Sequence, residues 1–291
     1  MASVPILGVE ATGVGTQAVL VRDGEVVSRI TEGPLNVLLD PTAFDRLAKL
    51  IRESGAAVAG LGLAGLRSER EAQLLEMQLR AKTGVPTVVG DDTEVAQLGA
   101  FNGGPGIVVI AHTGSNSFGR DAAGRVARAG GFGHVIGDEG SHYWIAAQAL
   151  RHAMRSLDGR GPKSAALEQA IVRTYGAGLE TVMMRVTEKA ADPGVVARAA
   201  KAVMALDNDP IVAGILDQAA DDLIAHVRAI SAKLGPLPVA MYGSVFDHSR
   251  IRQRFVAATG AVDVAAPPVF GAVVLASRPR GQRDMGFRAA S

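Results

Sequence analysis

The sequence predicts an α/β protein built from two related lobes that face a cleft. Each half of the chain begins in the same way, with a buried strand, a glycine turn and a hairpin, at residues 5–30 and 106–129. Strand and helix patterns follow both beginnings, and glycines at the tight turns mark the hairpins. We therefore expect an N-terminal α/β lobe of residues 1–105 and a C-terminal α/β lobe of residues 106–291.

Strand and helix patterns alternate through the first half. An apolar stretch of β-type spacing separates two amphipathic helical patterns. The second of these opens with Ser68 and Glu71, a capping-box pair that marks a helix N-terminus. We expect strands at residues 5–10, 18–22, 25–30, 57–63 and 86–89, and helices at residues 42–53, 69–82 and 93–101.

A largely helical segment is expected within the second half, from about residue 138 to residue 234. Its apolar residues recur at helical spacing, and clusters of glycine and proline divide it into several helices. Strands and helices are also expected on either side of it. These are a strand at residues 106–111, a hairpin at 116–129, a strand at 238–242, and helices at 249–259 and 270–277.

Composition excludes several classes of protein. The chain has 291 residues, of which 48% are hydrophobic and 20% are charged, so it can bury a sizeable core and disorder is not expected. The 30 Lys and Arg residues balance 29 Asp and Glu residues, which leaves no broad basic surface for nucleic acid. No apolar run of membrane-spanning length and no leader pattern occurs. We expect a soluble, cytoplasmic protein without nucleic-acid or membrane partners, and the absence of cysteine fits that location.

The most informative stretch runs from Gly130 to Ser141 and has the sequence GGFGHVIGDEGS. Glycine accepts positive φ and carries no Cβ, so this density of glycines around one acidic pair suggests backbone held close to a ligand. Helical spacing begins at Tyr143, which places Asp138 and Glu139 at or just before a helix N-terminus. The alternative is that Asp138 serves only as a helix cap.

One tempting motif is rejected. Residues Gly13 to Ala18 follow a strand and read GVGTQA, like the fingerprint of dinucleotide-binding proteins. That fingerprint requires a helix directly afterwards, whereas a hairpin pattern follows here. The chain also lacks the GxxxxGK[ST] pattern, so neither a nicotinamide site nor a P-loop is expected.

The segment from Gly130 to Ser141 resembles the GGWGxxxGDEGS signature of the N-acetylglucosamine kinase branch of the BadF/BadG/BcrA/BcrD ATPase family. Phe132 stands where that family usually has tryptophan. Further family motifs follow in the expected order over nearly the whole chain, and several motifs in register are more specific than any one. They are Gly8-Val9-Glu10 with Gly13 to Gln17, Asp91-Asp92, Thr113-Gly114-Ser115-Asn116 and Gly243-Ser244-Val245.

This resemblance implies a two-lobed actin-like ATPase fold, of ribonuclease H-like α/β type, with an interlobe cleft and with ATP and Mg²⁺ as cofactors. The family belongs to the superfamily of actin, Hsp70 and sugar kinases. Another branch of it activates radical dehydratases through a cysteine-bound iron–sulfur cluster. Such a cluster needs thiolate ligands, and the chain has no cysteine, so that role is excluded for this chain acting alone.

The resemblance assigns nucleotide contacts to three glycine turns. Backbone amides and hydroxyls in such turns can hold phosphates, although each turn could also be an ordinary hairpin turn. Two departures from the family affect these turns, because the first is longer than usual and His112 replaces a glycine. The expected phosphate and ATP contacts are Gly13, Gly15, Thr16, Thr113, Gly114, Ser115, Gly243 and Ser244.

Phosphoryl transfer to an alcohol needs a group that accepts the hydroxyl proton. Asp92 aligns with the family's catalytic aspartate and is the expected general base; Asp91 or Asp92 could instead cap the helix that follows. Glu10 ends the first strand and is expected to orient Mg²⁺ through water, because Mg²⁺ keeps several waters and few protein ligands. The alternative for Glu10 is a strand end that faces solvent.

Polar side chains should recognise the sugar, since unpaired buried polar groups penalise wrong substrates. By resemblance, the sugar contacts are Asn36, Asn116, Asp138 and the backbone of Gly131; Asn36 could also be an ordinary loop residue. The expected activity is ATP-dependent phosphorylation of N-acetylglucosamine or glucosamine. Muramic acid, N-acetylmuramic acid or glucose as substrate, a sugar-binding sensor without catalysis, and a homodimer are left open by the sequence.

Overall fold

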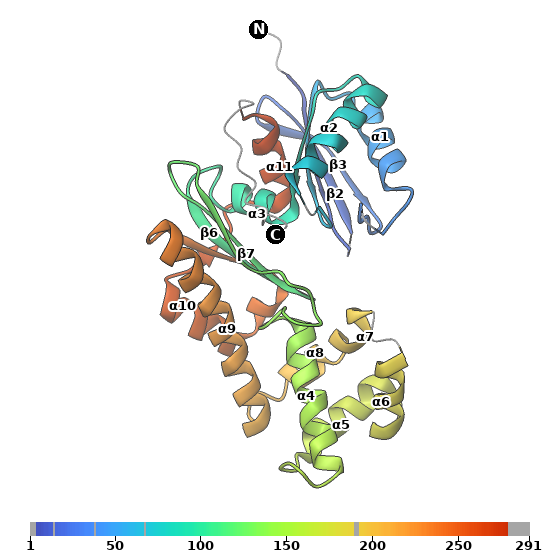
Figure 1. Ribbon diagram of the computed structural model, residues 1–291, viewed down its shortest axis with the longest axis vertical. Helices are drawn as coiled ribbons and strands as arrows, with labels where there is room; N and C mark the ends of the chain where they lie inside the picture. Colours follow the sequence, from blue (N-terminus) through green and yellow to red (C-terminus); the bar gives the residue numbers. More distant parts are fainter. Residues whose placement is uncertain (1–3, 14, 38, 67, 189–191, 279–291) are drawn as a thin grey trace. The chain divides into compact units, whose positions relative to one another are not determined.

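The computed structural model describes residues 4–13, 15–37, 39–66, 68–188 and 192–278 (Figure 1). The chain divides into two compact units. Within the described residues, the first unit comprises 4–108, 118–127 and 263–278, and the second comprises 109–117 and 128–262. These boundaries differ from the expected lobes of 1–105 and 106–291, mainly because the end of the chain groups with its beginning. The cleft between two lobes stays a prediction.

A five-stranded mixed sheet forms the centre of the first unit, in the order β3-β2-β1-β4-β5. β1 pairs antiparallel with β2 and parallel with β4, which pairs parallel with β5. Because Glu10 pairs with Gly62 and Leu63 pairs with Asp91, the carboxyl ends of the three parallel strands lie at one edge. The bounds are β1 Ile6–Ala11, β2 Thr16–Arg22, β3 Glu25–Glu32, β4 Val58–Leu63 and β5 Thr87–Asp91.

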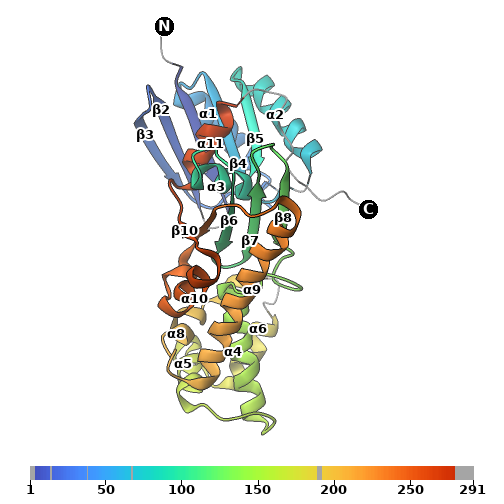
Figure 2. The same cartoon turned by 90° about the vertical axis from the view of Figure 1, so that its left-hand side faces the viewer.

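Helices cover both faces of this sheet, as Figures 1 and 2 show. On one face, buried leucines and isoleucine of α1 pack with Leu61, Leu63 and Leu79 in a continuous apolar cluster. On the other face, α3 and α11 meet the sheet through a smaller cluster that includes Val95 and Ala272. The helices are α1 Ala43–Ser54, α2 Glu69–Thr83, α3 Asp92–Ala100 and α11 Pro268–Ala276.

The second sheet has the order β10-β9-β6-β7-β8, and the boundary between the two units falls within several of its strands. Six helices then follow β8 in the sequence and belong to the second unit. The strands are β6 Gly106–Ala111, β7 Ser115–Arg120, β8 Val126–Gly130, β9 Val239–Tyr242 and β10 Val262–Asp263. The helices of the second unit are α4 His142–Leu157, α5 Ala165–Tyr175, α6 Leu179–Glu188, α7 Pro193–Ala197, α8 Ala200–Met204, α9 Pro210–Leu234, the 3₁₀ helix η1 Ser244–Asp247 and α10 Ser249–Thr259.

The local predictions agree closely with these elements. The hydroxyl of Ser68 accepts the backbone N–H of Glu71, as the capping pattern indicates. The hairpin after the GVGTQA motif is present, which confirms the rejection of a dinucleotide fingerprint. The short strand β10 was not predicted, because two residues carry no periodic pattern. Among the described residues, no helix is both long and apolar enough to cross a membrane.

Glycines allow α11 to lie directly on the strands beneath it. A Cβ added at Gly60 would overlap the carbonyl oxygen of Ala272, and one at Gly8 would lie 2.5 Å from the carbonyl oxygen of Val269. A Cβ at Gly271 would likewise overlap the carbonyl oxygen of Val95 in α3. Helix α11 therefore touches both the sheet and α3 through backbone atoms.

We predict that Gly60→Ala lowers the free energy of unfolding by about 3 kcal/mol, because the added methyl group must push α11 off the sheet. Urea unfolding followed by circular dichroism measures this change. The matched control is Gly214→Ala in α9, where an added Cβ meets nothing within 4 Å. That control should be neutral or gain about 0.5–1 kcal/mol from the helix propensity of alanine. Equal stability of the two variants would contradict the close packing of α11.

Candidate active site

Two adjacent aspartates at the end of β5 have different roles. The carboxylate of Asp91 accepts the backbone N–H of Glu94 at 2.8 Å and the hydroxyl of Thr93 at 2.6 Å. Asp91 is therefore the N-cap of α3, a role the sequence left open between the two aspartates. Asp92 is the first residue of the helix and does not cap it.

Glu10 and Asp92 form a pair of interacting carboxylates at the same sheet edge. Burial raises the pKa of Glu10 to about 7, and the negative charge of Asp92 adds to this increase. Glu10 is thus partly buried beside Asp92 and is not a strand end that simply faces solvent. Near neutral pH the pair holds a proton that ordinary carboxylates would have lost.

Glu10 and Asp92 suit Mg²⁺ better than they suit a metal whose ligands are all protein side chains. Within the described part of the chain, no three or more His, Cys, Asp or Glu side chains gather around a common point. Mg²⁺ in phosphoryl-transfer sites is usually bound by one or two carboxylates, several waters and the phosphates themselves. The number and type of donors at Glu10 and Asp92 agree with that pattern.

A buried ion pair holds the first turn of α3. Glu94 accepts a hydrogen bond of 2.6 Å from Arg120, and their side chains are only 2% and 4% exposed. An ion pair removed from water in this way tolerates little change in geometry, because either charge alone would be strongly destabilised. It therefore fixes the helix that carries Asp92. Neither residue is among the predicted site residues, since nothing in the sequence indicates that two charges 26 residues apart will meet.

The first predicted phosphate turn is closed by Thr12. Its hydroxyl donates to the carbonyl of Gly15 and accepts the backbone N–H of the same residue, at 3.1 and 3.3 Å. The buried hydroxyl of Thr16 donates to the carbonyl of Gly33 at 3.0 Å, so it is engaged inside the protein. A Cβ at Gly13 would meet nothing within 4 Å. The Gly15 N–H and the Thr16 hydroxyl are thus engaged within the protein, whereas Gly13 has open space beside it.

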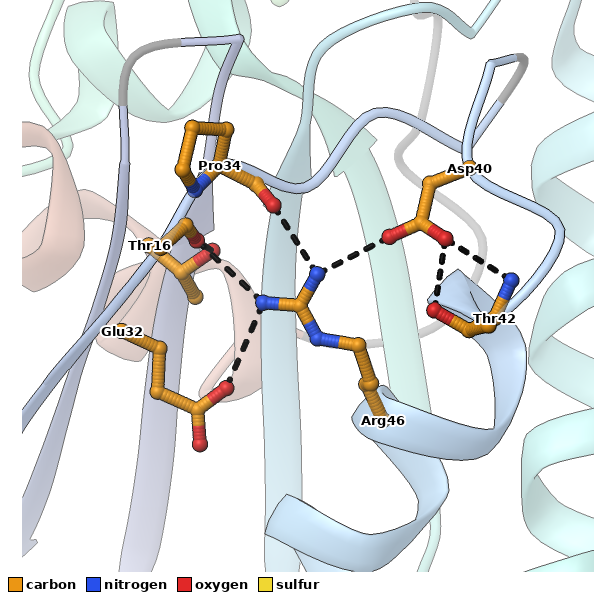
Figure 3. A network of polar contacts seen from close by, with 7 residues as sticks. Thr16, Glu32, Pro34, Asp40, Thr42 and Arg46 are labelled. Atoms are coloured by element: carbon orange, nitrogen blue, oxygen red, sulfur yellow. Dashed lines mark hydrogen bonds and ion pairs between the residues drawn. The ribbon is translucent and has the colours of Figure 1, made fainter.

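Arg46 anchors the segment that follows β3 (Figure 3). Its guanidinium donates to the carbonyls of Gly33 and Pro34 and forms ion pairs with Glu32 and Asp40. Directly after Gly33 and Pro34, the backbone N–H of Leu35 donates to the carbonyl of Thr12 at 3.0 Å. This network holds the segment after β3 against the first phosphate turn.

Asn36 lies at the same edge of the first sheet. A Cβ at Gly65 would be 2.6 Å from the amide oxygen of Asn36, so the asparagine side chain lies against the turn after β4. That turn is joined to β1 by the backbone hydrogen bond from Ala64 to Ala11, at 2.9 Å. The structure therefore brings Asn36 to the edge that carries Glu10.

In the second unit, Asp138 lies against the second predicted phosphate turn, Thr113 to Ser115. Its carboxylate accepts the backbone N–H of Ser115 at 3.3 Å, and a Cβ at Gly114 would be 2.8 Å from it. Burial raises the pKa of Asp138, while the Ser115 hydrogen bond opposes the rise. Helix α4 is capped by Ser141, whose hydroxyl accepts the N–H of Trp144, so Asp138 is not the helix cap.

Asn116 and Gly131 complete this group. A Cβ at Gly131 would lie 2.7 Å from atoms of the Asn116 amide, and the φ of Gly131 is +70°. The backbone N–H of Gly131 donates to the carbonyl of Ser115 at 3.0 Å. Thr113 is held from α4, because its carbonyl accepts the N–H of Tyr143 at 3.1 Å. The predicted sugar contacts of the second unit thus surround the second phosphate turn.

His112 connects the second phosphate turn to the turn after β9. Its Nδ1 accepts the backbone N–H of Ser244 at 3.2 Å, and the hydroxyl of Ser244 lies 3.3 Å away. The ring also makes an edge contact with Tyr242. At Gly243, with φ +119°, an added Cβ would overlap the carbonyl oxygen of Ala111. Burial lowers the pKa of His112, against the charge of Asp247, so its imidazole is neutral at pH 7.

The sequence pattern of one protein family matches residues 7–276. The chain belongs to the BadF/BadG/BcrA/BcrD ATPase family. A curated relative from Clostridium acetobutylicum, named N-acetylmuramic acid/N-acetylglucosamine kinase, is 32% identical to this chain over 173 residues. That match covers 55% of this chain and 56% of the relative, so the chain spans about half the length of the curated relative it matches.

Solved structures of this fold match almost the whole chain. A Chromobacterium violaceum protein described as a candidate N-acetylglucosamine kinase has a TM-score of 0.81 and 27% identity, with 94% of this chain and 98% of that one covered. A ROK family glucokinase from Streptomyces griseus, in complex with glucose and AMPPNP, has a TM-score of 0.60 and 16% identity, with 94% and 98% covered. The predicted family and the predicted actin-like α/β fold are confirmed.

We predict that Asp92→Asn lowers the pKa of Glu10, but only part of the way to its ordinary value of 4.5, because burial is the larger cause of the rise. Carbon-13 NMR titration of the Glu10 carboxyl group, without Mg²⁺, measures this shift. The folded chain keeps a proton that the unfolded chain releases, so stability should fall as pH rises from about 4.5 to about 7. Glu10→Gln should remove that part of the pH dependence. A Glu10 pKa that is the same in both proteins would show that the charge of Asp92 does not reach it.

Proposed function

We propose that this chain is an ATP-dependent kinase of an amino sugar, with N-acetylglucosamine or glucosamine as substrate. The observation that carries the proposal is the position of Asp92. Asp91 caps α3, while Asp92 lies beside Glu10 at the edge where the parallel strands end. In open α/β sheets, ligands bind outside the carboxyl ends of the strands. The names of the Clostridium and Chromobacterium relatives support an amino sugar as the acceptor.

Asp92 is the proposed general base. It accepts the proton of the attacking sugar hydroxyl as the oxygen forms a bond to the γ-phosphorus, and the bond from that phosphorus to the bridging oxygen of ADP breaks. The anchored first turn of α3 keeps Asp92 in one position, and such positioning supplies much of the rate enhancement in phosphoryl transfer. Mg²⁺, when bound, would neutralise developing charge on the phosphates, and Glu10 would hold it through water.

The glycine turns are the proposed phosphate and nucleotide contacts. Backbone N–H groups of Gly13 and Gly114 would face phosphate oxygens, and the turn at Gly243 and Ser244 would contact the nucleoside. Gly15 would shape the first turn, since its N–H donates to the Thr12 hydroxyl. ATP use agrees with membership of an ATPase family. Thr16 would contribute its backbone, since its hydroxyl is bonded to Gly33.

Asn116, Asp138 and the Gly131 backbone are the proposed sugar contacts in the second unit, and Asn36 is the proposed contact in the first. A carboxylate and an amide side chain supply both acceptors and donors for ring hydroxyls. The name of the Clostridium relative places N-acetylmuramic acid beside N-acetylglucosamine among the sugars to test. A homodimer and a cytoplasmic location remain predictions.

We predict that ADP release with Mg-ATP rises on addition of N-acetylglucosamine or glucosamine, and that Asp92→Asn lowers kcat by about 10²–10⁴, the usual contribution of a general base. A panel that adds N-acetylmuramic acid, muramic acid and glucose would identify the substrate. Asp121→Asn is a matched control, because that carboxylate is bonded to Arg125 on an exposed turn. Sugar binding without ADP release would instead favour a sugar-binding sensor. If a folded chain shows neither sugar binding nor ADP release, the proposal is rejected.

We predict that His112→Gly, which restores the family residue, changes the KM for ATP while the KM for sugar stays within about twofold. The physical reason is that the imidazole fills the space between the two turns proposed to hold the nucleotide and bonds to Ser244. Initial rates measured against both substrates separate the two KM values. A change confined to the sugar KM would place His112 outside the nucleotide site.

A further inference from the structure

A buried histidine on α9 contacts the two segments that carry the proposed sugar contacts of the second unit. His226 Nδ1 lies 3.0 Å from the hydroxyl of Ser117, which is fully buried on β7. The same ring lies against Gly130, where an added Cβ would be 2.8 Å from His226 Nε2. Ser117 directly follows Asn116, and Gly130 directly precedes Gly131.

Ser117 also determines how the Asn116 amide is turned. Its backbone N–H donates to the amide oxygen of Asn116 at 2.8 Å. The amide nitrogen of Asn116 donates to no hydrogen bond among the residues that the structure describes. The side chain therefore offers an N–H donor, and that donor suits an acceptor oxygen such as a sugar hydroxyl or an acetamido carbonyl.

The turn at Gly130 and Gly131 also lies against α9, the helix that carries His226. Gly130 and Gly131 both have φ of +70°, which favours glycine. A Cβ at Gly130 would overlap the ring of His226 on α9, and one at Gly131 would meet the Asn116 amide on β7. Helix α9 also supports the turn at Gly140, where a Cβ would be 2.7 Å from the carbonyl oxygen of Ala219. One helix thus lies behind both ends of the GGFGHVIGDEGS segment.

The charge state of His226 agrees with this role. Burial lowers its pKa, and the nearby carboxylate of Glu139 only partly opposes that shift. Asp222, one helical turn earlier on α9, has a pKa raised by burial and by Glu139. At neutral pH the imidazole is uncharged, and it forms a neutral hydrogen bond with Ser117 in an interior that could not easily hold its charge.

We infer that His226 is a positioning residue for sugar recognition, which holds the Asn116 amide through Ser117 and the Gly131 turn through Gly130. The inference rests on the proposed function, because it assigns the sugar as the ligand of Asn116. His226 does not touch the ligand itself. It keeps one donor and one backbone turn in the geometry that the sugar needs.

The test measures binding of N-acetylglucosamine to the full chain by isothermal titration calorimetry, without nucleotide. His226→Phe keeps the ring and removes the hydrogen bond, and Ser117→Ala removes the same bond from the other side. Each should raise the sugar Kd about tenfold, the effect of one hydrogen bond. Because both changes remove one interaction, the double variant should raise the sugar Kd by at most about twentyfold. Two independent effects would instead raise it about a hundredfold.

Two further variants separate positioning from general damage. In His226→Asn an amide reaches the place of Nδ1, so binding should return to within about threefold of the native chain. His248→Asn, at another histidine of the second unit whose Nε2 lies 3.0 Å from the Met204 carbonyl and 3.9 Å from the Asp207 carboxylate, should leave sugar binding unchanged. The KM for ATP should not move in the His226 variants. Unchanged sugar binding in a folded His226→Phe, or strictly additive losses, would overturn the inference.

If the native chain binds no amino sugar, the proposed function fails and the positioning role is judged by NMR. The side-chain amide signals of Asn116 should shift in Ser117→Ala and in His226→Phe and should remain in place in His248→Asn. Unshifted Asn116 signals would overturn the positioning role whatever the sugar result. Should His226→Phe not fold, Ser117→Ala carries the same comparison.

Discussion

Backbone contact between α11 and the first sheet is the constraint on which the catalytic half of the proposed site depends. Helix α11 can lie on β1 and β4 only because Gly8 and Gly60 have no Cβ, and α3 can lie beside it only because Gly271 has none. These contacts set the height of α3 above the sheet. Since Asp92 is the first residue of α3, the same packing decides where the proposed base lies relative to Glu10.

Polar interactions also hold α3 in the position that this close packing allows. Asp91 caps α3, and the buried pair of Glu94 with Arg120 prevents the helix from rotating or sliding. In the second unit, His226 and Ser117 play the corresponding part for the Asn116 amide. Both arrangements place a buried, hydrogen-bonded polar residue behind a residue proposed to meet the ligand, and such support keeps functional side chains in productive geometry.

Much of the fold could be predicted because its signals are local. Alternating apolar residues and the Asp-Gly turn indicated the β2–β3 hairpin, and Ser68 indicated the start of α2. Candidate site residues carried by short motifs, such as Asp92 and Asp138, could also be proposed from the sequence, because glycine turns and acidic pairs stand out in it. The role of Thr16 was harder to predict, since its hydroxyl is taken by Gly33, seventeen residues away along the chain.

The sequence by itself determined the α/β class, the order of the elements and the turns that carry the candidate site, because these depend on periodicity and on residues that tolerate special backbone angles. Only the tertiary structure decided which aspartate caps α3, that α11 belongs with the first sheet, and that His226 reaches Ser117 across 109 residues. Contacts between distant segments depend on which surfaces pack together. Hydrophobic burial and the pairing of buried polar groups select those surfaces. A local pattern shows which face of an element is buried, but not which distant segment packs against it.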